Sequence, residues 1–196
     1  MRTERRNHWN FGRGLKRGAC SGVVGLLLVF GLPGCHGAGP AVRVPALTLT
    51  STSFEGSQIP PKFTCNGAGI SPQLAWSAPP AGTASFALTV TDPDASVGTF
   101  VHWVLYDLPA DARSLPEGLS KQGQFADGSR QGRNDFGDLG YGGPCPPRHS
   151  THHYLFTLYA LNAKLKLAAG ATCKQVEAAI EGHILARGEL IGLYHQ

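Results

Sequence analysis

The stretch FALTVTDPDASVGTFVHWV, residues 86–104, decides the fold. Phe86, Leu88 and Val90 alternate with smaller residues, and this period of two predicts a β-strand. The Asp-Pro-Asp that follows is a turn signal, and an apolar run then resumes over residues 100–108. This second run is apolar at successive positions, as expected for a strand buried on both faces in the middle of a layered β structure.

Residues 154–161 form a third apolar run of the same kind. Turn residues separate these predicted strands at 66–67, 79–82 and 142–144. Together with 26 glycines and 14 prolines, they favour many short strands over long helices. The fold class is therefore predicted to be mainly β.

One helix is predicted near the C-terminus. Thr172 is followed by Gln175 at the spacing of a capping box. Apolar residues then recur at intervals of three and four, which predicts one buried helix face. These residues are Val176, Ala179, Ile180 and Ile184. Residues 189–194 after Gly188 are interpreted as a closing strand.

Polar residues follow or open the predicted strands. Asp92 comes directly after the first strand, and His102 opens the second. His152 and Tyr154 lie two positions apart, so they are expected on one face of the third strand, with His153 on the other. If these strands are neighbours, two imidazoles, a phenol and a carboxylate converge at one end of the sheet.

Such a cluster suits an oxyanion, because imidazole and phenol groups donate hydrogen bonds to phosphate. Asp92 would repel an anion, so its better role is to hold a histidine tautomer or to accept from an ammonium group. Backbone amides of the Gly142-Gly143 turn are further candidate donors. Taken singly, each feature also has a structural explanation as a turn, a satisfied buried histidine or an inert loop. Their combination favours a binding site.

The charge is concentrated near the N-terminus. Residues 1–34 hold six basic residues and one acid, which leaves 11 basic and 12 acidic residues in the remainder. A basic domain for nucleic acid is therefore not indicated.

The N-terminus is interpreted as an export leader over residues 1–35. A basic stretch precedes an apolar run at 23–30 that is too short for a confident membrane span. The following Leu32-Pro33-Gly34-Cys35 resembles the lipobox of bacterial lipoproteins, in which Cys35 would be acylated. Residues 36–45 are expected to be a flexible tether and residues 46–196 the folded domain. The predicted location is the periplasmic side of the cell envelope, lipid-anchored at Cys35 or otherwise secreted.

Three cysteines fall in the predicted domain. Export permits a disulfide, and Cys65 with Cys145 is the favoured pair because both flank predicted loops. Cys173 is then left over. Sequence alone does not fix the pairing.

Four segments together resemble the phosphatidylethanolamine-binding proteins (PEBPs), above all the bacterial Raf-kinase-inhibitor-like branch of the YbhB/YbcL type. They are TDPDA at 91–95, FVHWV at 100–104, GYGGPCPP at 140–147 and HxYxFxLYAL at 152–161. The resemblance covers about residues 47–196. It implies a β-sandwich with a Greek-key-type central sheet and a short helix near the C-terminus.

The resemblance also implies a small pocket for phosphate-type anions or phospholipid head groups. Carried over by position, its residues are Asp92, His102, His152 and Tyr154. The Gly142–Pro146 turn is expected to form a wall, with Gly143 and Pro144 among the binding residues and an amide near Gly143 to Cys145 in contact with the anion. Ser96 and His153 depart from the family pattern, which has proline and arginine there. No cofactor and no metal is implied.

A binding module that is not an enzyme is the leading functional hypothesis. An interaction protein that inhibits a protease or kinase is the alternative, although residues 122–139 are too polar to predict an aromatic contact loop. A metal-dependent hydrolase is disfavoured, because alternation separates His152 from His153. A serine hydrolase is disfavoured because no Gly-x-Ser-x-Gly elbow is present.

Overall fold

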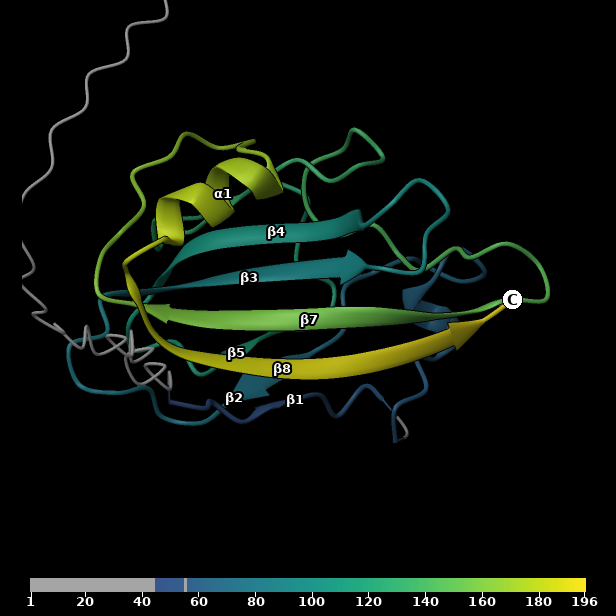
Figure 1. Cartoon of the computed structure of the whole chain (residues 1–196), viewed down its shortest axis with the longest axis horizontal. Coiled ribbons are helices and arrows are strands. Elements are labelled where there is room, and N and C mark those ends of the chain that lie inside the picture. Colours follow the sequence, from purple (N-terminus) through teal and green to yellow (C-terminus); the bar gives the residue numbers. More distant parts are fainter. Residues whose placement is uncertain (1–44, 55) are drawn as a thin grey trace, which may run out of the picture. The chain divides into compact units, whose positions relative to one another are not determined.

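Five antiparallel strands form the main sheet of a computed structural model that describes residues 45–54 and 56–196. The strands are β3 (Ser85–Asp92), β4 (Phe100–Pro109), β6 (Arg130–Gln131), β7 (Thr151–Leu161) and β8 (Ile184–His195). They lie in the order β6-β4-β3-β7-β8 (Figure 1). Since β3, β4 and β6 are successive neighbours and β7 returns to lie beside β3, the arrangement is a Greek key.

A second, three-stranded sheet covers one face of the first. It consists of β1 (Leu49–Thr50), β2 (Leu74–Trp76) and β5 (Ser114–Leu115), in the order β1-β2-β5. The main core joins buried apolar side chains of both sheets. They include Leu49, Leu74, Trp76, Phe86, Leu88, Val90, Trp103, Leu105, Leu115, Phe156 and Leu158. The predicted mainly β sandwich is confirmed.

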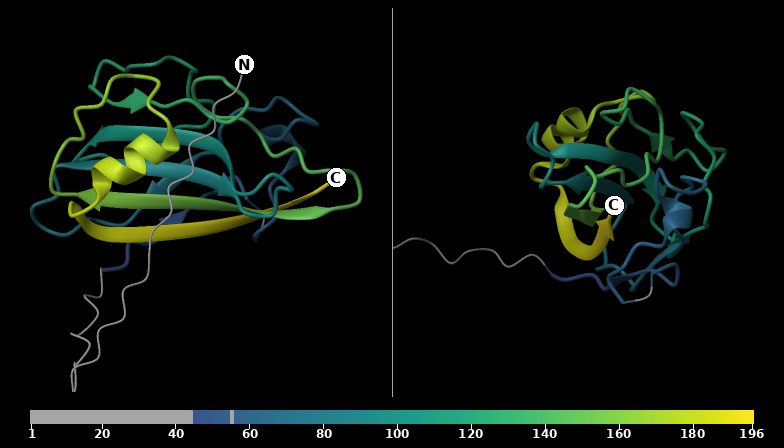
Figure 2. Two further views of the ribbon diagram at one scale, coloured as in Figure 1. Left: turned by 45° about the horizontal axis from the view of Figure 1, so that its top comes forward. Right: turned by 90° about the vertical axis from the view of Figure 1, so that its right-hand side faces the viewer.

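A smaller core lies on the opposite face of the main sheet, under the helix α1 (Cys173–Ile180), which crosses that sheet in the left view of Figure 2. It contains Ala87, Val104, Tyr106, Leu161, Val176 and Ile180. Strands β3, β4 and β7 are therefore buried on both faces, which the sequence predicts for β4 and β7, whereas for β3 it predicts only a strand with alternating residues.

The C-terminal elements differ in their bounds from the prediction. The capping box of Thr172 and Gln175 is present, but the helix ends at Ile180. Gly182 then adopts a φ of 76°, in the left-handed region that glycine tolerates. Ile184 consequently opens β8 instead of extending the helix face, and the closing strand starts five residues before the predicted Glu189.

The outer edge of β8 is partly covered by earlier segments of the chain. The amide of Leu47 donates to the carbonyl of Arg187, and the amide of Ile59 donates to the carbonyl of Leu193, both at 2.8 Å. Pairing of this kind protects an edge strand from association with other chains. Within residues 45–54 and 56–196, no helix has the length and apolar character needed to cross a bilayer. The predicted leader, Cys35 and most of the predicted tether lie outside the described residues.

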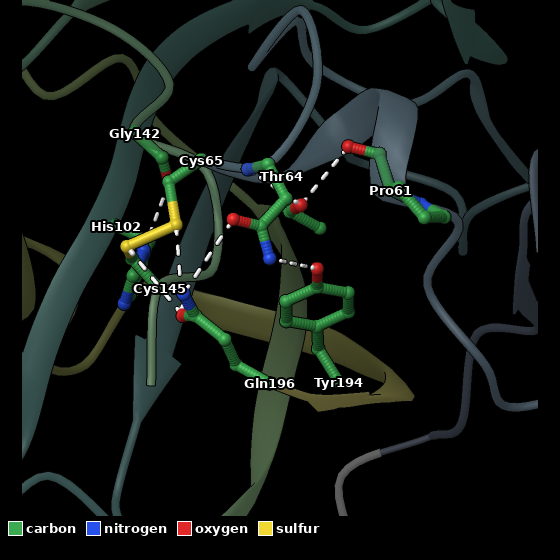
Figure 3. Close-up of a disulfide and its surroundings, with 9 residues drawn as sticks. Pro61, Thr64, Cys65, His102, Gly142, Cys145, Tyr194 and Gln196 are labelled. Carbon is green, nitrogen blue, oxygen red and sulfur yellow. Dashed lines mark hydrogen bonds between the residues drawn. A yellow bond between two sulfur atoms is a disulfide. The ribbon is translucent and has the colours of Figure 1, made fainter. Parts of the chain in front are cut away.

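A disulfide joins Cys65 to Cys145, the pair that the sequence favours (Figure 3). It links the loop after Gly142 to the segment that follows the 3₁₀ helix η1 (Pro61–Phe63). The amide of Cys65 also donates to the carbonyl of Pro144 at 3.0 Å. Cys173 is a free, buried thiol, and burial raises its pKa to about 12.

Replacing both bonded cysteines, Cys65→Ser with Cys145→Ser, is expected to lower the free energy of unfolding by about 2–4 kcal/mol, because the unfolded chain loses an 80-residue cross-link. Urea unfolding with and without reductant measures the effect. The parent protein should lose stability on reduction, and the double variant should not respond. Equal stability of parent and variant under oxidising conditions would contradict the structural role of this bond.

Candidate functional site

A β-bulge places His102. Val90 pairs with Trp103 and Thr91 pairs with Val101, so His102 is the extra residue in β4. A bulge re-aims a side chain out of the strict alternation of a strand. As a result His102 shares a face with its neighbour Trp103, on the side of the main core, and its ring lies against Tyr154, 5.1 Å between centroids.

Strand alternation places the groups of β7. His152 and Tyr154 lie on the core side and are buried. His153 lies on the other side and is exposed, where its backbone amide and its Nδ1 both bond to the carboxylate of Asp94. Those bonds hold the pKa of the Asp94 carboxyl below its usual range. This orientation is the one predicted from the spacing.

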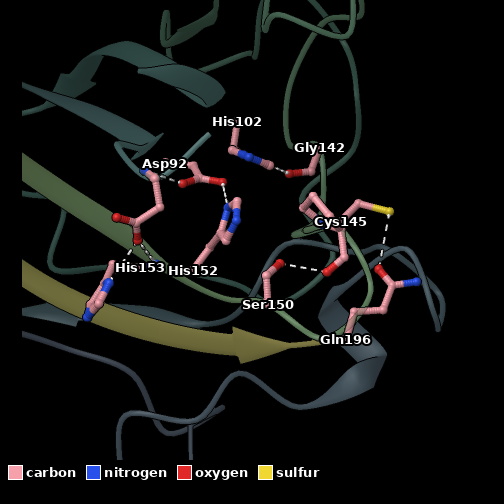
Figure 4. Close-up of polar contacts among 10 residues, drawn as sticks. Asp92, His102, Gly142, Cys145, Ser150, His152, His153 and Gln196 are labelled. Carbon is pink, nitrogen blue, oxygen red and sulfur yellow. Dashed lines mark hydrogen bonds and ion pairs between the residues drawn. The ribbon is translucent and has the colours of Figure 1, made fainter. Parts of the chain in front are cut away.

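Asp92 and His152 form a buried pair where β3 ends beside β7 (Figure 4). Nδ1 of His152 lies 2.7 Å from Oδ2 of Asp92. Oδ1 of the same carboxylate accepts the amide of Asp94 at 2.8 Å. Because an ionised carboxylate only accepts, it fixes the tautomer of His152 with the proton on Nδ1. This is the first of the two roles expected for Asp92.

His102 is anchored by the loop after β6. Its Nδ1 lies 2.8 Å from the carbonyl oxygen of Gly142, and the amide of Gly142 donates back to the His102 carbonyl at 2.8 Å. Since a carbonyl only accepts, Nδ1 of His102 also carries a proton. Burial lowers the pKa of His102, although the bond to Gly142 and the charge of Asp92 oppose that effect.

These groups enclose one cavity of about 190 Å³. Its polar part consists of Asp92, Ser96, His102 and His152, and the rest is largely apolar. The lining residues are Asp92, Ala95, Ser96, Phe100, His102, Phe136, Cys145, Pro146, Pro147 and His152. Three of the sequence-predicted residues thus meet in one hollow.

The other predicted residues are not among those that line this cavity. Gly143 has no space for a side chain, since a Cβ would lie 2.7 Å from the carbonyl oxygen of Phe63. The carbonyl of Pro144 accepts the amide of Cys65. Residues 145–147 line the cavity, so Cys145 and Pro146 of the predicted wall lie there, whereas Gly143 and Pro144 do not. Of the turn amides predicted as donors, that of Gly142 donates to the His102 carbonyl, and a donor role of the amides from Gly143 to Cys145 stays a prediction.

Tyr154 lies beside the cavity and is almost fully buried, 1% exposed. Its hydroxyl has no hydrogen-bond partner among the described residues. Burial and the charge of Asp92 raise its pKa, whereas the nearby amide of Cys145 lowers it. Tyr154 is therefore a neutral phenol at physiological pH.

Phe136 is the lining residue that sequence reasoning missed. It lies in the polar segment 122–139, yet it is 49% exposed and its ring centroid is 5.4 Å from that of His102. The only signal in the sequence is that Phe136, like Phe125, is an aromatic residue in this polar segment. Its contact with His102 depends on tertiary structure.

A phosphatidylethanolamine-binding protein family model matches residues 50–195. The chain belongs to this family. The match includes all three elements that supply the buried polar side chains of the cavity.

Relatives in several organisms agree with the PEBP assignment. A UPF0098 protein of Aquifex aeolicus is 50% identical over 151 residues, covering 76% of this chain and 88% of the relative. The "Putative lipoprotein LppC" of Mycobacterium tuberculosis is 38% identical over 194 residues, covering 88% and 94%. The crystal structure of Escherichia coli YbcL, described as a member of the mammalian PEBP family, superposes with a TM-score of 0.71 at 33% identity, covering 76% and 98%.

The hydrogen-bond pattern determines what this PEBP cavity can bind. Both Nδ1–H groups are used, and no described residue bonds to Nε2 of His102 or His152. A neutral ring offers its Nε2 as an acceptor, whereas a protonated ring offers an N–H donor. The site can therefore accept bonds from an ammonium or a phosphate hydroxyl, and it can donate to an oxyanion after taking up a proton.

Among the described residues no group of three or more His, Cys, Asp or Glu side chains is placed to hold a metal ion. His153 points away from His152, as the alternation predicts. His149 lies in the loop before β7 and has a φ of 64°. The three histidines therefore do not converge on one point.

The two Asp–His pairs offer a matched comparison. Asp92→Asn is expected to lower the free energy of unfolding by about 1–3 kcal/mol, because a buried charged acceptor with two donors is lost. Asp94→Asn, in the exposed pair with His153, should cost less than about 1 kcal/mol. Urea denaturation of both variants checks the difference, and equal effects would contradict the structural role of the buried pair.

Acid should destabilise the protein partly through His102. Its pKa is lower in the folded than in the unfolded protein, so unfolding takes up protons as the pH falls below the ordinary histidine value of about 6.5. Stability contributed by neutral His102 is present above that pH and is lost on acidification. His102→Gln should flatten the acid limb of unfolding free energy against pH, whereas His183→Gln, at an exposed histidine bonded to the uncharged side chain of Asn162, should leave it unchanged.

Proposed function

We propose that this PEBP-family protein binds a small phosphate-type anion or a phospholipid head group and carries out no chemical step on it. The observation that supports the proposal is the pair of buried imidazoles, His102 and His152, which line one cavity beside a carboxylate. Each ring is fixed through Nδ1, so Nε2 is the nitrogen left for a ligand. Fixed donors and acceptors of this kind lower the entropy cost of binding.

The dimensions favour a head group. Pockets for drug-sized ligands are typically about 300–1,000 Å³, and this cavity is about 190 Å³. It has room for a compact polar group and not for an acyl chain. The apolar wall of Phe100, Phe136 and Pro147 suits the carbon atoms next to such a group.

The charges favour a ligand that carries both signs. Protonated imidazoles would bond an oxyanion through charge-assisted hydrogen bonds, whereas Asp92 and neutral imidazoles would attract an ammonium. Phosphoethanolamine carries both groups. It is therefore the first organic ligand to test.

The relationship to LppC supports a lipoprotein of the cell envelope. We therefore propose that Cys35 is acylated, that residues 36–45 act as a tether and that the domain faces the periplasmic side. Secretion without a lipid is the alternative. Metabolic labelling with a fatty-acid analogue tests the anchor, since Cys35→Ala should abolish the label if Cys35 carries the lipid.

Calorimetric titration with sulfate and with phosphoethanolamine tests the binding function. Sulfate keeps its charge in this range, so any pH dependence reports the protein. Saturable binding is expected to be tighter at about pH 6 than at about pH 8, because binding to Nε2 requires protonated imidazole. His152→Ala should weaken sulfate binding at least about tenfold, the equivalent of one hydrogen bond to a charged group.

His153→Ala is the matched control, because this histidine lies on the opposite face and should leave the affinity unchanged. Absence of binding at both pH values would overturn the proposal. The exposed side chains of Val97 and Phe136, on loops beside the cavity, would then favour the alternative of an inhibitor-type protein that contacts a protein partner.

A further inference from the structure

Phe136 is held in place by its own turn. The amide of Asn134 donates to the carbonyl of Asp138 at 2.9 Å. The amide of Gly137 donates to the carbonyl of Asn134 at 3.1 Å. The carboxylate of Asp135 accepts the amide of Val101 at 2.8 Å, which fastens the turn to β4. These hydrogen bonds hold the turn that carries the exposed side chain of Phe136.

The Phe136 ring covers His102. The two rings meet edge to face, with a centroid distance of 5.4 Å and an interplanar angle of 76°. Phe100 packs against the Phe136 ring, with a centroid distance of 4.8 Å. His102 itself is only 3% exposed, so these phenyl rings occupy space from which water would otherwise reach the imidazole.

Gly142 makes this contact possible. A Cβ at Gly142 would lie 2.5 Å from Cδ2 of Phe136. The missing side chain lets the phenyl ring lie against the same loop whose carbonyl fixes Nδ1 of His102. Phe136, which covers the imidazole, and Gly142, which anchors it, therefore lie against each other.

We propose that Phe136 shields His102 from water and thereby sets the pH below which the cavity takes up an oxyanion. This inference rests on the binding function proposed above and adds the residue that regulates it. Removing the phenyl ring would hydrate His102, so the imidazole would accept its second proton at higher pH. Oxyanion binding would then extend to higher pH as well.

Several other groups also affect the pKa of His102. Asp92 at the end of β3 and Asp135 in the Phe136 turn both favour protonation, as do the carbonyls of Gly142 and Gly143. Burial opposes all of them and is the larger effect, because the net direction of the pKa is downward. Shielding by apolar side chains therefore outweighs the neighbouring charges.

Proton NMR titration of the His102 ring, assigned by its absence in His102→Gln, tests the shielding directly. Phe136→Ala is expected to raise the midpoint by roughly one pH unit, a moderate part of the shift that burial can produce. Phe136→Leu keeps an apolar cover and should stay close to the parent. Val97→Ala, in the neighbouring exposed loop, is the matched control and should cause no shift.

Sulfate titration of the same variants tests the coupling to the ligand. At a pH above both midpoints, Phe136→Ala should bind sulfate about tenfold more tightly than the parent, as a one-unit rise in midpoint requires. An unchanged or lower midpoint in Phe136→Ala would overturn the shielding. Absence of sulfate binding in every variant, with the midpoint shift intact, would instead overturn the proposed function and the coupling while establishing the shielding.

Discussion

The central strands β3, β4 and β7 are buried on both faces, and this constraint determines where polar chemistry can occur. A polar side chain in the middle of such a strand would lose its hydrogen bonds with water at a cost of about 1–3 kcal/mol unless it finds a partner. Where the strands end, loops can supply that partner. Asp92, His102 and His152 lie at this end of the sheet, and each is bonded to a loop or to another member of the group.

Loop packing completes the site. The loop of residues 142–147 brings a carbonyl to His102 and proline rings to the cavity, and the disulfide fastens it to the segment after η1. Gly143 lets this loop pass close to the backbone of Phe63 and Thr64. The wall is therefore held by a covalent bond and by close backbone packing. Beside it, the buried hydroxyl of Tyr154 has no hydrogen-bond partner among the described residues.

The protonation of the site follows from the same burial. A carbonyl and a carboxylate fix Nδ1–H on the two imidazoles, so the character of the cavity depends on whether Nε2 carries a second proton. Burial lowers the pKa of His102 and keeps it neutral near physiological pH. A site with this arrangement is expected to couple ligand binding to proton uptake, which distinguishes it from a permanently positive anion site built on arginine.

By itself the sequence determined the local and periodic features. The alternation at 86–90 predicted a β-strand, the Thr172 capping box predicted the start of the helix, and the spacing of His152 and Tyr154 placed them on one face. These features depend on residues close together in the chain. The family motifs added the Greek-key-type central sheet and agreed with the polar cluster that the strand pattern had already selected. Only the tertiary structure decided that β4 bulges at His102 and that Gly143 and Pro144 do not line the cavity. It also decided that Ile184 belongs to β8 and that Phe136 lies against a histidine 34 positions away. Such features arise when segments distant in sequence compete for the same space, and no local pattern records the outcome of that packing.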